Sequence, residues 1–338
     1  MTRLTKATIR GPRRVDRTPP VNIDQADHRV FEHEYSKTLP AFSVYRGRRV
    51  YIYRGMLFGP LRCYPRFYHL GSNQRKLALK KRIRLILRHV VDLSDGIWIT
   101  DNHSGNYFHW ITDSLTKLMA GRYRSKTVLL PEGLRRISYV QQSLELLGFT
   151  PTYLDDHSVY RVTRLELPSR TAPTGNYDPD ILRQLRRQLS EHTISGDDQK
   201  KIYVSRSGAA RRQLKNEHEI CQVLERRGFE TVSFEDLSLT QQIRLASRCR
   251  VLIGLHGAGL TNMLFLPPGA HVIEIRMRGD RHNNCYFSMA SALGLHYWYA
   301  FAEPDQQETL YANSILESEV LDDLLNAVER ARASMQGP

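Results

Sequence analysis

Residues 250–276 read RVLIGLHGAGLTNMLFLPPGAHVIEIR. The apolar run at 251–255 predicts a buried strand, and the β-branched run at 272–275 predicts a second one. Between them lie a glycine-rich turn, a short apolar segment and a Pro-Pro-Gly stop. Strand, glycine turn, helix and strand make one unit of a parallel sheet, with the turn at a strand's carboxyl end. The segment therefore predicts an α/β fold.

The glycine-rich turn is the first candidate binding site. Ligands of open α/β sheets bind at the carboxyl edge of the strands, where glycines let backbone N–H groups approach a phosphate. The spacing of Gly254, Gly257 and Gly259 does not match the dinucleotide fingerprint, and no Walker lysine follows, so a turn without a ligand is the alternative. We expect the turn to hold the diphosphate of a nucleotide-sugar. The residues assigned to it are His256, Gly257, Ala258, Gly259, Leu260, Thr261 and Asn262.

Two charged residues extend this candidate site. Glu274 lies in an otherwise apolar strand, where a carboxylate is costly to bury without a partner. Either the hydroxyl pair of a ribose or a structural arginine would be such a partner. Arg206 ends the strand expected at 201–205, so we expect its guanidinium to bind a diphosphate oxygen; a solvent-facing arginine is the alternative.

Length and composition are those of a globular protein. The 338 residues suffice for two domains, and 41% of them are hydrophobic. No run approaches about 20 apolar residues and the N-terminal stretch has no apolar core, so neither a transmembrane helix nor a signal peptide is expected. The four cysteines form no CxxC pair, which argues against zinc and against a disulfide framework. We expect a cytoplasmic protein.

A formal net charge of +14 indicates anionic partners. Nucleic acid is one candidate, but no nucleic-acid module or interleaved aromatic platform accompanies the charge, so no specific nucleic acid is expected. Peripheral contact with an anionic membrane at its inner face, binding of phosphorylated or acidic-sugar substrates, and an ordinary solvated surface all stay open.

Strands and helices alternate along both halves of the chain. In the first half we expect a hairpin at 42–53, strands at 96–100, 127–130 and 164–168, and helices at 76–91, 106–120 and 138–147. In the second half we expect strands at 201–205, 230–234, 251–255, 272–275 and 297–301, and helices at 179–192, 216–227, 240–247, 260–266, 283–293 and 318–333.

These elements predict four parts of the chain. The polar, proline-bearing residues 1–25 are expected to form a flexible tail. Residues 26–172 are expected to form an acceptor-side α/β domain and residues 173–310 a nucleotide-sugar-binding α/β domain, joined near the loop-like stretch 169–180. Residues 311–338 are expected to form a helix that packs back on the first domain.

A second polar constellation lies at 101–113, DNHSGNYFHWITD. A helix over 106–120 would bury Phe108, Ile111, Leu115 and Leu118 on one stripe. Its other face would carry Asn106, His109, Asp113 and Lys117.

The chemistry on this face centres on His109 and Asp113. Spaced at i and i+4, they are able to hydrogen-bond, which orients the imidazole and raises its basicity. General-base removal of a hydroxyl proton needs such a pair. Which of the two is the base stays open, since Asp113 would serve equally to orient His109. Asn106 and Lys117 are assigned to the acceptor side, and a solvated polar helix face is the alternative.

Asp178-Pro-Asp180 superficially resembles a metal-binding Asp-x-Asp pair. It follows a loop, however, and an aspartate that caps a helix with proline in its first turn explains it without a metal. No metal and no other cofactor is expected.

Together the two constellations resemble glycosyltransferase family 61. The matching residues are Asn106-Tyr-Phe-His-Trp-Ile-Thr-Asp113, Tyr203-Val-Ser-Arg206, Asn216-Glu217, Gly228-Phe229, Glu235, Gln242, His256-Gly-Ala-Gly-Leu-Thr-Asn262 and Val272-Ile-Glu274. The resemblance covers roughly residues 96–300. It implies a GT-B-like α/β architecture, with two Rossmann-like domains facing each other across a cleft, inversion at the anomeric carbon and no divalent metal. Bacterial members are commonly linked to capsule or other surface polysaccharides.

We therefore expect an inverting glycosyltransferase that moves a hexosyl or pentosyl group from a nucleotide-sugar, UDP-linked as in eukaryotic members, to a glycan or glycolipid hydroxyl. His109 or Asp113 would deprotonate the acceptor, and Arg206 with the 257–260 turn would hold the diphosphate. One rival is a non-catalytic nucleotide- or polyanion-binding protein that uses the basic surface. An epimerase or hydrolase of nucleotide-sugars is another.

Overall fold

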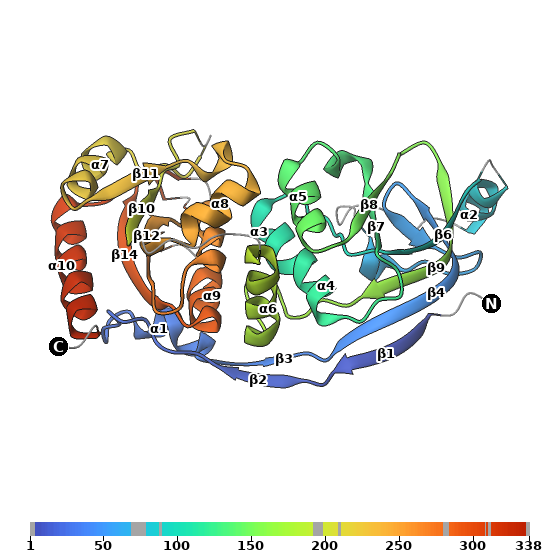
Figure 1. Cartoon of the computed structure of the whole chain (residues 1–338), viewed down its shortest axis with the longest axis horizontal. Helices are drawn as coiled ribbons and strands as arrows, with labels where there is room; N and C mark the ends of the chain where they lie inside the picture. Colours follow the sequence, from blue (N-terminus) through green and yellow to red (C-terminus); the bar gives the residue numbers. More distant parts are fainter. Residues whose placement is uncertain are drawn as a thin grey trace. The chain divides into compact units, whose positions relative to one another are not determined.

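The computed structural model describes residues 4–68, 79–87, 90–191, 199–208, 211–279, 284–307, 309 and 312–335. The chain forms two compact units, the first of residues 1–15 and 38–191 and the second of residues 16–37 and 192–338. Each unit has a sheet with parallel strands and packed helices, which confirms a mixed α/β fold (Figure 1). The arrangement of two domains facing each other across a cleft stays a prediction.

The second unit is built on a six-stranded sheet in the order β11-β10-β12-β13-β14-β15. All neighbouring strands are parallel except β14 and β15. Its strands are β10 (Lys200–Val204), β11 (Phe229–Val232), β12 (Cys249–Leu255), β13 (His271–Met277), β14 (His296–Pro304) and β15 (Ser314–Ile315). The chain runs outward in opposite directions from β10 and β12, so the carboxyl ends of these two strands form the switch point where such sheets bind ligands.

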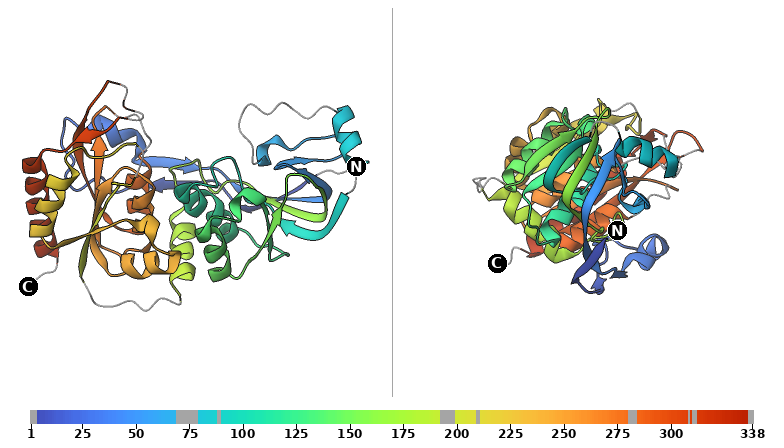
Figure 2. Two further views of the ribbon diagram at one scale, coloured as in Figure 1. Left: turned by 90° about the horizontal axis from the view of Figure 1, so that it is seen from above. Right: turned by 90° about the vertical axis from the view of Figure 1, so that its right-hand side faces the viewer.

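Helices cover both faces of this sheet. The longer ones are α7 (Glu217–Arg226), α8 (Leu239–Ala246), α9 (Cys285–Leu293) and α10 (Ser318–Met335). α7 and α10 lie on one face and α8 and α9 on the other (Figures 1 and 2). The glycine turn continues into η6 (Ala258–Phe265), a 3₁₀ helix where the sequence predicted a helix at 260–266. α8 begins at a capping box of Ser238 and Gln241, and α9 ends at Gly294 in the left-handed conformation.

The C-terminal helix α10 packs within the second unit. Leu321, Leu325 and Val328 lie in one hydrophobic cluster with Leu224 of α7 and Trp298 of β14. This differs from the expectation that the helix packs on the first domain. The apolar stripe of α10 packs against the sheet of its own unit and against α7.

The segment 16–37 also belongs to the second unit, although it lies in sequence between two parts of the first unit. It carries α1 (His28–Phe31) and η1 (Glu32–Glu34). Phe31 is fully buried, and its ring centroid lies 5.3 Å from that of Phe287 and 5.0 Å from that of Tyr299. Aromatic packing therefore holds this segment on α9 and β14.

The first unit has a mixed sheet in the order β1-β4-β9-β6-β7-β8, with β5 paired to β4. β9, β6, β7 and β8 run parallel, whereas β4 is antiparallel to β1, β5 and β9. It therefore departs from the all-parallel sheet of a Rossmann-like domain. The strands are β1 (Thr5–Arg10), β4 (Phe42–Tyr53), β5 (Met56–Phe58), β6 (Val90–Ile97), β7 (Thr127–Pro131), β8 (Thr150–Leu154) and β9 (Val159–Pro168).

Two expectations for this sheet are corrected. Residues 42–53 form the single strand β4 and not a hairpin; the turn comes at Arg54-Gly55, whose positive φ angles of 48° and 69° suit a two-residue hairpin turn into β5. The stretch 1–25 is not simply a tail. β1 pairs with β4, and β2 (Arg13–Asp16) pairs with β3 (Ser36–Leu39). The polar composition that suggested a flexible tail is compatible with strands that are half exposed to solvent.

The helices of the first unit include α2 (Leu79–Ile86), α5 (Ser138–Leu146) and α6 (Pro179–Ser190). Parts of the helix predicted at 76–91 lie outside the described residues. Asp178 caps α6 by accepting from the amides of Asp180 and Ile181, and it pairs with Arg13 at 3.2 Å, so the capping interpretation is confirmed. Within the described part of the chain, no helix combines the length and hydropathy needed to cross a membrane.

Candidate active site

The ends of β10 and β12 bring Arg206 against the glycine turn. A Cβ added to Gly257 would lie 2.0 Å from Nη1 of Arg206, and one added to Gly259 would lie 2.6 Å from Cγ1 of Val204. The φ of Gly257 is 173°, so glycine is required here by close approach and not by a left-handed backbone. The structure thus brings together the arginine and the turn that the sequence assigned to one site.

A second arginine, Arg212, lies at the same place. Its Nη2 donates to the carbonyl oxygen of His256 at 2.6 Å, and its own carbonyl accepts from Nε of Arg206 at 3.4 Å. Burial and the neighbouring positive charge of Arg212 lower the pKa of Arg206. An anion bound at this edge would relieve that repulsion. The sequence patterns did not single out Arg212.

The His256 side chain is hydrogen-bonded to a buried carboxylate. Its Nδ1 hydrogen-bonds Glu274, whose other oxygen accepts from the hydroxyl of Tyr297 at 2.5 Å and lies 3.8 Å from the guanidinium of Arg276. The His256 side chain is 14% exposed and that of Glu274 is 0%. The imidazole therefore faces the site and the carboxylate does not.

The surroundings of Glu274 favour its ionised form. Burial acts to raise its pKa, but the positive charge of Arg276 and the contact with His256 outweigh burial and hold the pKa below its usual value. These contacts favour the structural-arginine alternative over the ribose partner. Arg276 lies two residues along the same strand and hence on the same face, a period-2 signal that the sequence contained.

The polar residues after the turn are interior. Thr261 and Asn262 are fully buried, and Nδ2 of Asn262 donates to the carbonyl oxygen of Gly259 at 3.2 Å. Tyr286 of α9 also supports the turn by donating to the carbonyl oxygen of Gly257 at 2.6 Å. In this arrangement Asn262 and Tyr286 shape the turn. The amide of Leu260 donates to the carbonyl oxygen of Gly257 at 3.0 Å, which leaves the amides of Ala258 and Gly259 as the donors for a ligand. No sequence signal pointed to Tyr286.

The predicted His109–Asp113 pair forms in the first unit. Nδ1 of His109 lies 2.9 Å from Oδ2 of Asp113, which also accepts from Oγ1 of Thr174 at 3.1 Å. The His109 side chain is 22% exposed and that of Asp113 is 6% exposed. Because Nδ1 of His109 is bonded to Asp113, Nε2 is the ring nitrogen that would face the hydroxyl of an acceptor substrate.

The helix that carries this pair is not a uniform α-helix. It runs as α3 (Tyr107–His109), the π-helical η3 (Trp110–Leu115) and α4 (Thr116–Ala120). The four residues of the predicted apolar stripe are buried, but so is every residue from Trp110 to Ala120, so the polar face is not a solvated one. π-Helical turns often occur at functional sites.

Asn106 and Lys117 have local partners. Asn106 caps α3 by accepting from the amide of Phe108. The Lys117 ammonium is buried and donates to the carbonyl oxygen of Ile99 at 2.6 Å. Burial lowers the pKa of Lys117 to about 8, against the opposing effects of Asp101 and Asp113. Lys117 is therefore an interior residue bonded to the backbone of its own unit, and its acceptor-side assignment stays a prediction.

Residues 107–273 match the family model described as Glycosyltransferase 61. The chain carries a glycosyltransferase 61 domain. The match confirms the resemblance, and it includes His109, Asp113, Arg206 and the turn at 256–262, ending one residue before Glu274.

Curated relatives of the glycosyltransferase 61 domain match over short segments. The EGF domain-specific O-linked N-acetylglucosamine transferase of Drosophila melanogaster is 39% identical over 89 residues, 25% of this chain and 17% of that protein. Its namesake in Bos taurus is 41% identical over 64 residues, 19% of this chain and 12% of that protein. Protein O-linked-mannose beta-1,4-N-acetylglucosaminyltransferase 2 of Xenopus laevis is 35% identical over 83 residues, 24% and 14% of the two chains. The chain thus spans less than a fifth of each relative's length.

Proposed function

We propose that this chain is an inverting, metal-independent glycosyltransferase that moves a sugar from a UDP-linked donor to a hydroxyl of a glycan acceptor. The observation that carries the proposal is the approach of Arg206 to the glycine turn at the β10–β12 switch point. The named relatives are N-acetylglucosamine transferases, which makes UDP-N-acetylglucosamine the first donor to test.

The donor diphosphate binds at the turn in this proposal. Arg206 and the first amides of η6 hold its oxygens, and Arg212 adds a second positive charge. His256 presents Nε2 to the leaving phosphate, while Glu274 fixes the ring through Nδ1. Preorganised donors of this kind stabilise the charge that develops on the leaving diphosphate, which is the task a divalent metal performs in other transferases.

The acceptor is activated by His109. Its Nε2 takes the proton of the acceptor hydroxyl while that oxygen forms a bond to the anomeric carbon. The bond between the anomeric carbon and the diphosphate oxygen breaks on the opposite face, UDP leaves with the bonding electrons, and the configuration inverts. Asp113, more buried and bonded to Thr174, orients His109 and stabilises its protonated form.

The wider setting is proposed from the bacterial resemblance. We place the reaction in the synthesis of capsule or another surface polysaccharide, in the cytoplasm or at the inner face of the membrane. The net charge of +14 supports contact with anionic lipid or anionic glycan.

The alternative is a non-catalytic protein that binds nucleotides or polyanions through its basic surface. It predicts nucleic acid binding that weakens steeply with salt and that does not depend on His109. An epimerase or hydrolase would use the same diphosphate site without an acceptor.

A thermal-unfolding screen tests the proposal. UDP, GDP, CMP and their sugars are added with and without EDTA, and UDP release is then measured with the sugar that binds. A nucleotide at 100 times its dissociation constant adds about 2.7 kcal/mol of stability, so we expect a clear shift with UDP that EDTA leaves unchanged. A shift with nucleic acid alone would favour the binding protein, and a UDP shift abolished by EDTA would refute metal independence.

A further inference from the structure

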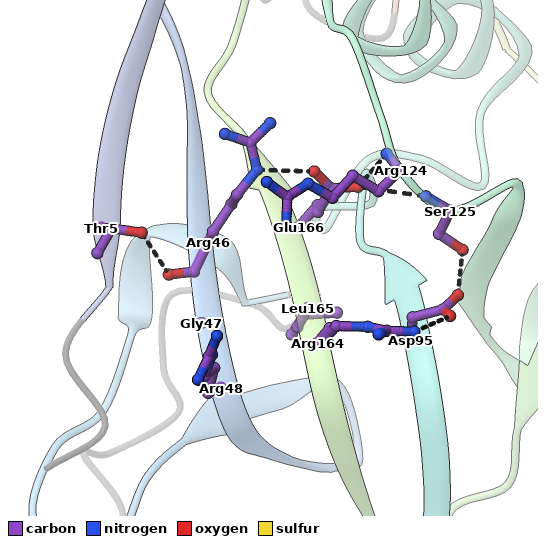
Figure 3. Close-up of a pocket in the computed structure, with 10 residues that line it drawn as sticks. All are labelled: Thr5, Arg46, Gly47, Arg48, Asp95, Arg124, Ser125, Arg164, Leu165 and Glu166. Atoms are coloured by element: carbon purple, nitrogen blue, oxygen red, sulfur yellow. Dashed lines mark hydrogen bonds and ion pairs between the residues drawn. The ribbon is translucent and has the colours of Figure 1, made fainter.

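A second pocket lies on the sheet of the first unit, apart from the residues assigned to transfer. It has a volume of about 710 Å³, within the roughly 300–1,000 Å³ of small-molecule sites. Figure 3 shows its lining side chains, which come from β1, β4, β6, β9 and the loop before β7. They belong to Thr5, Arg46, Gly47, Arg48, Asp95, Arg124, Ser125, Arg164, Leu165 and Glu166.

Strand register gathers the charges on one face. Arg46 stands opposite Glu166, and Arg48 stands opposite Arg164, which in turn stands opposite Asp95. Residues two apart on a strand share a face, so these two cross-strand rows lie side by side. Leu165, between Arg164 and Glu166 on β9, belongs to the hydrophobic cluster of the unit.

The pocket has a fixed floor. The buried Glu166 accepts from Nε of Arg46 at 2.9 Å and from the amide of Arg124 at 2.8 Å. Asp95 accepts from Oγ of Ser125 at 2.5 Å and from Nη2 of Arg164 at 3.1 Å. Two arginines are thus held in place by two carboxylates, and these carboxylates retain further lone pairs.

The remaining two arginines supply the net charge. The side chains of Arg48 and Arg124 are exposed and form no ion pair with any other residue that the structure describes. Four guanidiniums against two carboxylates leave an excess of two positive charges. Figure 3 shows the Arg124 side chain extending over Glu166 toward Arg46, so the charge is directed into the pocket.

We propose that this pocket binds an anionic saccharide, a sugar that carries a phosphate or a carboxylate. Guanidinium forks match phosphate and carboxylate oxygens in pairs. Further lone pairs of Asp95 and of the exposed Thr5 hydroxyl, which itself donates to the carbonyl oxygen of Arg46, match the hydroxyl donors of a sugar. The two carboxylates in the wall would disfavour a small, densely charged ion. The pocket's volume and its charged side chains suit an anionic sugar better than inorganic phosphate or an uncharged ligand.

Calorimetry with the full chain tests this site. Glucose 6-phosphate, glucuronic acid, glucose and inorganic phosphate are titrated at low salt in the presence of saturating UDP, which keeps the nucleotide site occupied. We expect saturable binding of glucose 6-phosphate or glucuronic acid, at least tenfold tighter than that of inorganic phosphate, and none of glucose. The sugar that binds tells which anionic group the pocket takes.

Two double variants locate the binding. Arg48→Ala with Arg124→Ala should weaken it at least tenfold. Arg136→Ala with Arg183→Ala, which removes the same charge from exposed positions elsewhere in the unit, should leave it unchanged. Both should bind UDP like the wild type, so failure here is separable from failure of the donor site. Absent binding of both anionic sugars, equal binding of inorganic phosphate, or equal loss in the two double variants would overturn the proposal.

Discussion

His109 and His256 are arranged in the same way, in different units. Each has Nδ1 bonded to a carboxylate more buried than itself, Asp113 in one case and Glu274 in the other. A carboxylate on Nδ1 fixes the tautomer and the orientation of the ring. The first pair was predictable because its partners are four residues apart on one helix. The second was not, because β12 and β13 bring its partners together only in the sheet.

His109→Ala should lower kcat by about 10²–10⁴-fold, the usual contribution of a general base, and leave the dissociation constant of UDP unchanged. Initial rates of UDP release and calorimetry measure the two quantities. His103→Ala is the matched control, because the His103 ring is exposed and lies 5.0 Å from that of His109. Equal losses in the two variants would remove His109 from the mechanism.

Glu274→Gln should destabilise the fold by about 3–5 kcal/mol, because the buried guanidinium of Arg276 loses its counter-charge. Urea denaturation measures this cost. The exposed pair of Glu303 and Arg278 gives the control, since Glu303→Gln should change stability by at most about 1 kcal/mol. If Glu274→Gln folded as stably as the wild type but bound UDP less tightly, the ribose assignment would regain support.

Lys117 should give stability a pH dependence. Its pKa falls from 10.5 to about 8 on burial, so between these values the unfolded chain keeps a proton that the folded chain has lost, and stability rises with pH. Relative to Lys117→Met, the wild-type free energy of unfolding should increase by about 1 kcal/mol between about pH 7 and pH 9. The exposed Lys126, replaced in the same way, should show no such trend. A constant difference for Lys117→Met would contradict a buried ammonium.

At the scale of elements, strand patterns were more informative than turns. The five parallel strands of the second unit lie where apolar and β-branched runs predicted strands. The first unit holds two Arg-Gly pairs in one β-rich stretch, and the sequence favoured Arg46-Gly47 as the turn. In the structure Gly47 lies inside β4, where an added Cβ would meet Val50 at 2.5 Å and Leu4 at 2.8 Å, whereas Arg54-Gly55 forms the turn. The close approach of Val50 and Leu4, and not a turn, explains why residue 47 is a glycine.

The helix 106–120 shows a similar limit. Its apolar period was correct, but a π-helical segment and burial on all sides depend on packing against α6 and the sheet. Side-chain periodicity alone contains neither fact.

Gly257→Ala tests the glycine turn as an element. The new methyl group would collide with Nη1 of Arg206, so the guanidinium must move and UDP affinity should fall at least tenfold, with a smaller effect on stability. Gly133→Ala is the control, because an added Cβ there meets nothing within 4 Å. Unchanged UDP binding in Gly257→Ala would separate Arg206 from the nucleotide site.

At the level of the whole molecule, the chain forms two compact units, and the second includes a segment from near the N-terminus. Residues 16–37 pack on β14 and α9, far along the sequence, because Phe31 and its aromatic neighbours form one cluster. Sequence patterns alone group such a segment with the strands that follow it in the chain. The net charge can be counted from the sequence, but the places where the charge gathers cannot. Strand register brings arginines together at the β10–β12 edge and in the pocket lined by Arg46, Arg48, Arg124 and Arg164.

In the proposed mechanism, Arg206 and the glycine turn hold the diphosphate of a UDP-sugar. The most direct measurement is calorimetric titration of UDP into the wild type, Arg206→Ala and Arg226→Ala, an exposed control at the end of α7. A charge-assisted hydrogen bond contributes about 1.5–3 kcal/mol, so Arg206→Ala should bind UDP about 10–100-fold more weakly, and Arg226→Ala should match the wild type. No UDP binding by the wild type, or the same UDP affinity in Arg206→Ala as in the wild type, would contradict the assignment of the diphosphate to Arg206.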